Sequence, residues 1–251
     1  MAANLEFAVS RIASVNPATG EVLGELDSAG PTEVRAAVAR ARSAQPDWNA
    51  WGIRDRVRVL RRFQQILLAH KTDIGRRIAQ EAGKPAVEAL VTEVLVVLDA
   101  ARFLIGNAFA ILREQKLPHG SPALQAKSGR ILYEPYGVVG IISPWNYPFS
   151  IPATEALAAL VAGNAVVLKP SELTPLIALE LQALLREAGV PDDVFQVLPG
   201  EGATGAALTG PPSPPVYTSA TASRRSARPR RPARSCGSDR PRAAGSSAPA
   251  R

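Results

Sequence analysis

The sequence predicts an α/β protein in which several helices precede the first part of a parallel sheet. Strand-like and helix-like segments alternate with short links between Tyr133 and Leu208, and this order is typical of parallel strands joined by right-handed crossovers. The strand-like segments are continuous apolar runs, as expected for strands covered on both faces. Before them, between Pro31 and Leu112, apolar residues recur every three or four positions, which indicates amphipathic helices.

The first 112 residues predict an extended arm and then a set of helices. The arm contains the turn cluster Asn16–Gly20, and Thr32 is placed to cap the first helix. Gly83 follows a helical stretch and is expected to be its C-cap. The expected segments, in order, are the arm 13–30, a helix from Pro31, a connector Gln45–Trp51, and helices Arg54–His70, Lys71–Glu81 and Val87–Leu112.

The most apolar stretch, Ala89–Leu112, is interpreted as a buried helix. It contains Glu93, Asp99 and Arg102, and charges at this density argue against a membrane span. The N-terminus has no basic region followed by an apolar core, so no signal peptide is expected. These observations predict a soluble, cytoplasmic protein that does not interact with membranes.

Residues 111–136 predict an extended hairpin around a polar loop, and three strand–helix pairs are expected after it. The hairpin strands would be Ile111–Leu117 and Arg130–Tyr136, on either side of the loop Pro118–Gly129. The later strands are expected at Val138–Ile142, Ala165–Leu168 and Val194–Leu198, and the helices at Ile151–Leu160, Leu176–Ala188 and Ala203–Gly210.

The formal net charge of +7 is unevenly distributed along the chain. Residues 211–251 contain nine Arg and one Asp, a balance of +8, whereas the preceding 210 residues carry 20 basic and 21 acidic side chains, a balance of −1. This Arg/Pro/Ser/Ala-rich tail is expected to be disordered, because it has few apolar side chains to bury. No specific nucleic-acid partner is expected, although a basic tail could bind phosphate backbones without specificity. The single cysteine, Cys236, excludes a disulfide framework.

Three loops follow the expected strands and would lie at the carboxyl edge of the sheet, where open parallel sheets bind ligands. They are Ser143–Pro148, Lys169–Glu172 and Pro199–Gly205. Asn146 could donate its side-chain N–H to an oxyanion, and Lys169 and Glu172 could bond ribose hydroxyls. The glycines of the third loop would let the backbone approach a cofactor closely.

Each of these features also has a purely structural interpretation. Asn146 could be a helix cap, and Lys169 with Glu172 could be a solvated ion pair. The G-x-G-x-x-G spelling of the third loop is a weak signal by itself, and here it follows the third strand instead of the first. The occurrence of all three features in order, each after an apolar strand, favours a ligand site.

Taken together, these segments resemble the NAD(P)-dependent aldehyde dehydrogenase superfamily. The resemblance is carried by GVVGIISPWNYPF (137–149), GNAVVLKPSELT (163–174), GVPDDVFQVLPGEGATG (189–205), NPATGEVLGEL (16–26) and RDRVRVLRRFQQIL (54–67), and covers roughly residues 13–210. It implies an aldehyde dehydrogenase-like α/β fold with the first part of a Rossmann-type sheet. The implied parts are an arm and helices of the cofactor-binding domain (1–112), an oligomerisation-type hairpin (113–135), a partial NAD(P)-binding unit (136–210) and the disordered tail (211–251).

The resemblance also implies roles for individual residues. Asn146 would stabilise the oxyanion that forms when a cysteine thiolate attacks an aldehyde, which is then oxidised to a carboxylic acid. The cofactor would be NAD, with NADP possible, and homo- or hetero-oligomers could form through residues 113–135. No metal is implied. The implied cofactor-binding residues are Ile142, Ser143, Pro144, Trp145, Lys169, Ser171, Glu172, Gly202 and Gly205.

After residue 210 the sequence departs from the family pattern. The nucleophilic cysteine, the general-base glutamate and the catalytic domain are expected to be absent, and Cys236 lies in no matching context. Val216–Ala220 stands where the family has an FTGS-type turn. We therefore expect a chain that is inactive alone, and a base shift near codon 210 of a GC-rich gene is one hypothesis for the tail. The alternative function is a non-catalytic remnant or a subunit that binds a full-length homologue.

Overall fold

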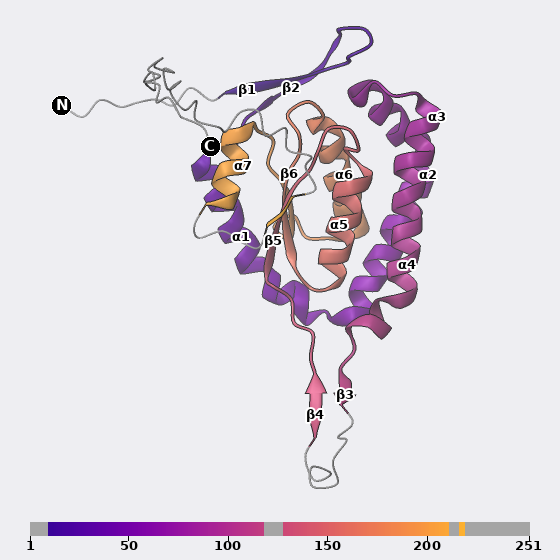
Figure 1. Cartoon of the computed structure of the whole chain (residues 1–251), viewed down its shortest axis with the longest axis vertical. Helices are drawn as coiled ribbons and strands as arrows, with labels where there is room; N and C mark the ends of the chain where they lie inside the picture. Colours follow the sequence, from indigo (N-terminus) through magenta and orange to yellow (C-terminus); the bar gives the residue numbers. More distant parts are fainter. Residues whose placement is uncertain (1–9, 118–127, 211–215, 219–251) are drawn as a thin grey trace, which may run out of the picture. The chain divides into compact units, whose positions relative to one another are not determined.

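Four parallel strands form the central sheet, in the order β7–β6–β5–β8 (Figure 1). The computed structural model describes residues 10–117, 128–210 and 216–218. All residues of β6 are buried, as the continuous apolar run predicts for a strand between two others. The predicted fold class and the parallel pairing are confirmed. The four strands are β5 (Val138–Ile142), β6 (Ala165–Lys169), β7 (Phe195–Val197) and β8 (Val216–Thr218).

Helices cover both faces of this sheet. Their bounds are α1 (Pro31–Ala50), α2 (Gly52–Ala82), α3 (Ala86–Ala89), the π-helical turn η1 (Leu90–Val94), α4 (Leu95–Leu112), α5 (Ser150–Val161), α6 (Pro175–Ala188) and α7 (Gly202–Thr209). Helices α1 and α7 pack on one face, and α5 and α6 on the other (Figure 1). Helices α2 and α4 form a further layer against α5 and α6.

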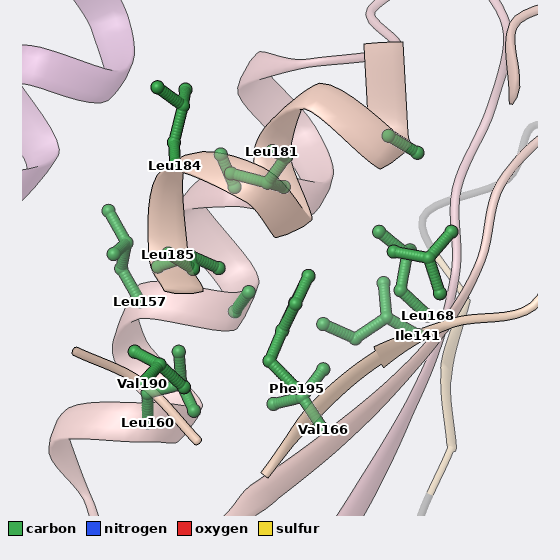
Figure 2. Packing of buried hydrophobic residues seen from close by; sticks show 14 of the residues in the cluster. Ile141, Leu157, Leu160, Val166, Leu168, Leu181, Leu184, Leu185, Val190 and Phe195 are labelled. Carbon is green, nitrogen blue, oxygen red and sulfur yellow. The ribbon is translucent and has the colours of Figure 1, made fainter. Parts of the chain in front are cut away.

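The core between the sheet and helices α5 and α6 consists of large apolar side chains. Figure 2 shows leucines of α5 and α6 in one buried cluster with Ile141, Val166, Leu168 and Phe195 of the strands. Burial of each such side chain contributes about 1.5–3 kcal/mol. This packing holds β5, β6 and β7 in place, and with them the loops at their carboxyl ends.

The predicted connector Gln45–Trp51 is wrong, because α1 continues to Ala50. Trp48 explains the difference: its buried ring donates its Nε1–H to the carbonyl of Leu160 at 3.0 Å. This contact with α5 stabilises a helical turn that local sequence, with its proline at position 46, does not favour.

The start of α1 and the number of helices after residue 53 also differ from the predictions. The N-cap of α1 is Gly30, not Thr32, and Pro31 occupies the first turn, where its missing N–H costs nothing. The two helices predicted after residue 53 are one 31-residue helix, α2. Its C-cap is Gly83, as predicted, and φ of 69° places this glycine in the left-handed region.

The apolar segment Ala86–Leu112 is only partly buried, contrary to the prediction of a buried helix. By length and composition it could cross a membrane, but a soluble protein's apolar helix meets the same criterion. Its inner side packs on α2 and α5. Its exposed large apolar side chains are Val87, Val91, Leu95, Val96, Phe103, Phe109 and Ile111.

Two antiparallel hairpins accompany the sheet. In the arm, β1 (Arg11–Val15) pairs with β2 (Val22–Asp27). Farther along, β3 (Gln115–Leu117) pairs with β4 (Gly129–Ile131), which confirms the hairpin predicted for residues 111–136. Most of the loop predicted between those strands lies outside the described residues.

The boundary predicted at residue 210 needs correction. Within the segment expected to be a disordered tail, Val216–Thr218 forms β8, which pairs with β5 so that Gly140 faces Val216. The sheet therefore includes a fourth strand from the range 211–251. The other residues of that range, Cys236 among them, lie outside the described residues.

Candidate functional site

The carboxyl ends of β5, β6 and β7 meet at one edge of the sheet. Ile142 on β5 faces Lys169 on β6. Beyond the strands, the N–H of Ser143 donates to the carbonyl of Lys169 at 3.1 Å, and the N–H of Leu198 donates to that of Leu168 at 2.8 Å. The three loops predicted from sequence thus begin side by side, as expected for a ligand-binding edge.

Lys169 and Glu172 form an ion pair. The pair is not fully solvated, contrary to the purely structural interpretation of the sequence. The side chain of Lys169 is 7% exposed and that of Glu172 is 47% exposed, with 3.2 Å between Nζ and Oε2. A buried ammonium beside a half-exposed carboxylate is costly unless its donors are used. The pair therefore presents both a donor and an acceptor at the end of β6, which suits hydroxyl groups of a ligand.

The ionised form of Glu172 is favoured at this position. Burial acts to raise the pKa of Glu172, but its own backbone N–H and both the charge and the hydrogen bond of Lys169 outweigh burial and lower the pKa below its ordinary value. At neutral pH the carboxylate is therefore an acceptor, not a donor.

Asn146 is not the cap of α5. It is exposed in the loop between β5 and α5, and the first amides of the helix, those of Phe149 and Ser150, donate to the carboxylate of Glu93 at 2.8 and 3.1 Å. Among the described residues, the side-chain amide of Asn146 has no hydrogen-bond partner. Because Glu93 performs the capping, the amide of Asn146 is available to a ligand.

Lys84 and Glu93 are part of the site, and the sequence reasoning did not assign them to it. Lys84 Nζ donates to Glu93 Oε1 at 2.6 Å and to the carbonyl of Asn146 at 2.9 Å. It also lies 4.5 Å from the ring centroid of Tyr147, a favourable cation–π distance. The signal in the sequence was Glu93 itself, a carboxylate within an apolar run, which must be paired when it is buried.

The glycines of the third loop serve different purposes. A Cβ at Gly200 would collide with Thr204 Oγ1, whose hydroxyl donates to the carbonyl of Ala29 at 2.6 Å. Gly200 is therefore explained by internal packing, not by the approach of a cofactor. A Cβ at Gly202 would meet no atom within 4 Å, and one at Gly205 would lie 3.7 Å from Ile142 Cδ1, so the open side of this loop is at Gly202.

The other predicted site residues line the same edge. Ser143, Pro144 and Ser171 are buried, and Ser171 Oγ accepts from the N–H of Leu173 at 3.3 Å. Trp145 is 55% exposed beside Asn146. In the part of the chain that the structure describes, no group of three or more His, Cys, Asp or Glu is placed to hold a metal ion.

Solved structures similar to this one share its topology. An NADP dependent enzyme of E. coli is 34% identical with a TM-score of 0.75, over 81% of this chain and 41% of that chain. An aldehyde dehydrogenase of Brucella melitensis biovar abortus 2308 is 30% identical with a TM-score of 0.75, over 80% and 41%. An aldehyde dehydrogenase of Bacillus cereus, solved as an NAD+ complex, is 31% identical with a TM-score of 0.73, over 79% and 40%. The chain thus spans about 41% of the length of the first two of these proteins.

A family model gives the same assignment over most of the sequence. The model of the aldehyde dehydrogenase family matches residues 6–228. This match is wider than the resemblance over 13–210 that the motifs carry, and it includes β8, Val216–Thr218. The chain belongs to the aldehyde dehydrogenase family.

Proposed function

We propose that the described residues form the cofactor-binding side of an NAD(P)-dependent aldehyde dehydrogenase, which oxidises an aldehyde to a carboxylic acid. The observation that carries the proposal is the buried Lys169 held by Glu172 at the carboxyl end of β6, beside the loop that presents Asn146. The NAD+ complex of the Bacillus cereus enzyme supports it. The bound dinucleotide would supply the hydride acceptor, and the chain's own residues would position it.

The residues at the sheet edge fit a dinucleotide. Lys169 can donate to ribose oxygens, and the ionised Glu172 can accept from ribose hydroxyls. Gly202 leaves space at the start of α7, where backbone N–H groups favour an anion. Ile142 at the end of β5 and the loop residues Ser143–Trp145 would lie beside the dinucleotide.

Glu172 favours NAD over NADP. Its half-exposed carboxylate, kept ionised by Lys169, would repel a phosphate on the 2′ oxygen of the ribose and accept from a free hydroxyl. NADP remains compatible with the proposal, since a similar solved structure is that of an NADP dependent enzyme of E. coli.

Asn146 would act on the substrate. Its exposed amide can donate to the oxyanion that develops when a thiolate adds to an aldehyde carbonyl. The only cysteine of the sequence is Cys236, in the Arg/Pro/Ser/Ala-rich segment, and acyl transfer needs an activated nucleophile. We therefore expect no aldehyde oxidation by this chain alone. The frameshift hypothesis for that segment is tested by reading the coding DNA in the other two frames.

The alternative function is a non-catalytic subunit that binds a full-length homologue. It is supported by the exposed apolar side chains of the Ala86–Leu112 segment, such as Phe103 at 57% and Val87 at 73% exposure, because exposed apolar patches mark interaction surfaces. The hairpin β3–β4, within the 113–135 segment, is the second candidate surface. Co-expression with a full-length homologue and size-exclusion chromatography of the mixture distinguishes this role from a purely monomeric one.

Binding of NAD+ to the full chain, measured by isothermal titration calorimetry, tests the principal proposal. Substitution Glu172→Gln is expected to weaken NAD+ binding by roughly tenfold, because a hydrogen bond to a charged group is lost, and to narrow the preference for NAD+ over NADP+. The matched control is Glu180→Gln on α6, whose half-exposed carboxylate pairs with Arg77 at 3.8 Å. A folded chain that does not bind NAD+, or binding that Glu172→Gln leaves unchanged, contradicts the proposal.

A further inference from the structure

We propose that Lys84 and Glu93 are positioning residues that hold the loop between β5 and α5, residues 143–149, in the geometry that presents Asn146. The inference rests on the proposed function, in which the loop must present the amide of Asn146 to a substrate. Both residues act through backbone atoms of the loop, so they orient the amide of Asn146 without touching a substrate.

Glu93 holds the end of the loop. Its side chain is fully buried, and its Oε2 accepts from the amides of Phe149 and Ser150 at 2.8 and 3.1 Å. These amides belong to the start of α5, 56 residues away from Glu93 along the chain. A carboxylate at a helix N-terminus is also favoured by the helix dipole, so the start of α5 is tied firmly to η1.

Lys84 holds the middle of the loop. Its ammonium reaches Glu93 Oε1 at 2.6 Å and the carbonyl of Asn146 at 2.9 Å, and it lies over the ring of Tyr147 at 4.5 Å. Its side chain is 10% exposed. The hydrogen bond to Glu93 is partly buried, whereas the one to the carbonyl of Asn146 lies at the surface. The loop is therefore held at Asn146, at Tyr147 and at the helix start by two side chains that neutralise each other.

The position of Glu93 coincides with an irregularity of the helix that carries it. Glu93 lies within the π turn η1, between α3 and α4. A π turn carries an energetic cost and is frequent at functional sites. Here it occurs where the buried carboxylate meets the loop, which supports a role beyond the packing of α4.

Glu81 provides a matched comparison within the same molecule. It is buried near the end of α2, and its two oxygens accept from the amides of Leu176 and Ile177, at 2.8 and 2.7 Å. It thus caps α6 as Glu93 caps α5, but none of its hydrogen bonds reaches the 143–149 loop. Loss of either carboxylate removes a buried cap, and only loss of Glu93 should free the loop.

Hydrogen exchange of the full chain, followed by mass spectrometry without any cofactor, tests the inference. Glu93→Gln is expected to speed exchange in residues 143–150 by at least about tenfold, because its amide would face either the Lys84 ammonium or the two N–H groups as an unpaired donor. Glu81→Gln should speed exchange in residues 174–178 instead. Equal exchange of the 143–150 segment in the two variants overturns the inference.

Variants of Lys84 keep the test decisive if Glu93→Gln does not fold. Lys84→Met should speed exchange of the amides of Phe149 and Ser150 by several-fold, because their acceptor Glu93 loses its partner cation. Lys84→Arg, which keeps the charge and the donors, should restore most of the protection. No difference between these two variants also overturns the inference. Because exchange is measured without NAD+, its outcome is independent of the calorimetric test of cofactor binding.

Discussion

Three of the buried charged side chains in the described residues, Glu81, Glu93 and Arg56, bond the ends of other helices. Glu81 and Glu93 cap α6 and α5, and Arg56 donates to carbonyls at the ends of α1 and α5. Each charge faces the helix end of opposite partial charge, which is the favourable sense of the helix dipole. At the scale of single residues, these three buried charges therefore satisfy backbone groups, whereas buried Lys169 pairs with the side chain of Glu172.

Glu81 predicts a specific pH dependence of stability. Burial raises the pKa of Glu81 above its ordinary value of 4.5, outweighing the hydrogen bonds from Ser14, Leu176 and Ile177 and the charge of Arg77, which lower it. As the pH rises past 4.5, the carboxyl group of Glu81 loses its proton in the unfolded chain before it does so in the folded chain. The folded state then binds more protons, so the contribution of Glu81 to stability, complete below that pH, falls until its raised pKa is passed.

Urea denaturation of the wild type and of Glu81→Gln across this pH range measures the effect. The free energy of unfolding of the wild type relative to the variant should decrease as the pH rises from about 4.5 through the raised pKa, because Gln does not titrate. The control for the loss of a carboxylate as such is the exposed Glu25, replaced by Gln. A relative stability that increases with pH over this window contradicts the assignment.

At the scale of elements, one guanidinium joins two helices. Arg56 on α2 is 3% exposed. It donates to the carbonyl of Val161 at 3.0 Å and to that of Asn49 at 2.7 Å, and burial lowers the pKa of this guanidinium. The carbonyls belong to the last turns of α5 and α1, which would otherwise have no intrahelical partner.

Replacement Arg56→Met should destabilise the protein by about 2–5 kcal/mol, because the carbonyls at both helix ends lose buried donors. The free energy of unfolding from urea denaturation measures it. Arg58→Met is the matched control, since Arg58 is exposed on the same helix and pairs with Asp55; its effect should stay below about 1 kcal/mol. If the two variants lose similar amounts of unfolding free energy, the hydrogen bonds of Arg56 to these carbonyls contribute little to stability.

At the scale of the whole molecule, the apolar surface of the Ala86–Leu112 segment is the unusual feature. Its outward side chains include Val91 at 55%, Leu95 at 56% and Phe103 at 57% exposure. The free energy of folding does not account for them, because exposed apolar groups contribute no burial. Because so many apolar side chains are exposed on one segment, we infer that another protein surface covers this side of it.

The substitution Phe103→Ser should therefore leave the free energy of unfolding within about 0.5 kcal/mol, as for other surface changes. It should reduce binding of a hydrophobic dye and concentration-dependent association, measured by fluorescence and by sedimentation. Leu67→Ser on α2 is the contrasting variant. Because Leu67 is fully buried, this substitution should lower the free energy of unfolding by several kcal/mol. If Phe103→Ser does not change dye binding, the dye binds a surface other than that of the Ala86–Leu112 segment.

Local patterns in the sequence were sufficient for much of this architecture. The apolar runs predicted β5, β6 and β7 and their parallel order, and Gly83 and Gly189 mark left-handed helix ends. They did not predict the continuity of α1 through Pro46 or the strand β8, whose three residues lie in a segment rich in Arg and Pro. Both depend on partners in other elements, Leu160 for Trp48 and Gly140 for Val216.

The sequence by itself determined the order of elements, the three loops at the sheet edge and the motifs that carry the family resemblance, because periodicity and turn residues act over a few neighbouring positions. Only the tertiary structure decided that Asn146 is not a cap, that Lys169 is buried and that Lys84 and Glu93 hold the loop. The first and the last of these facts depend on hydrogen bonds between groups up to 62 residues apart, and the burial of Lys169 depends on packing around the end of β6. Such groups meet only when burial of the apolar core has brought α2 and η1 against α5.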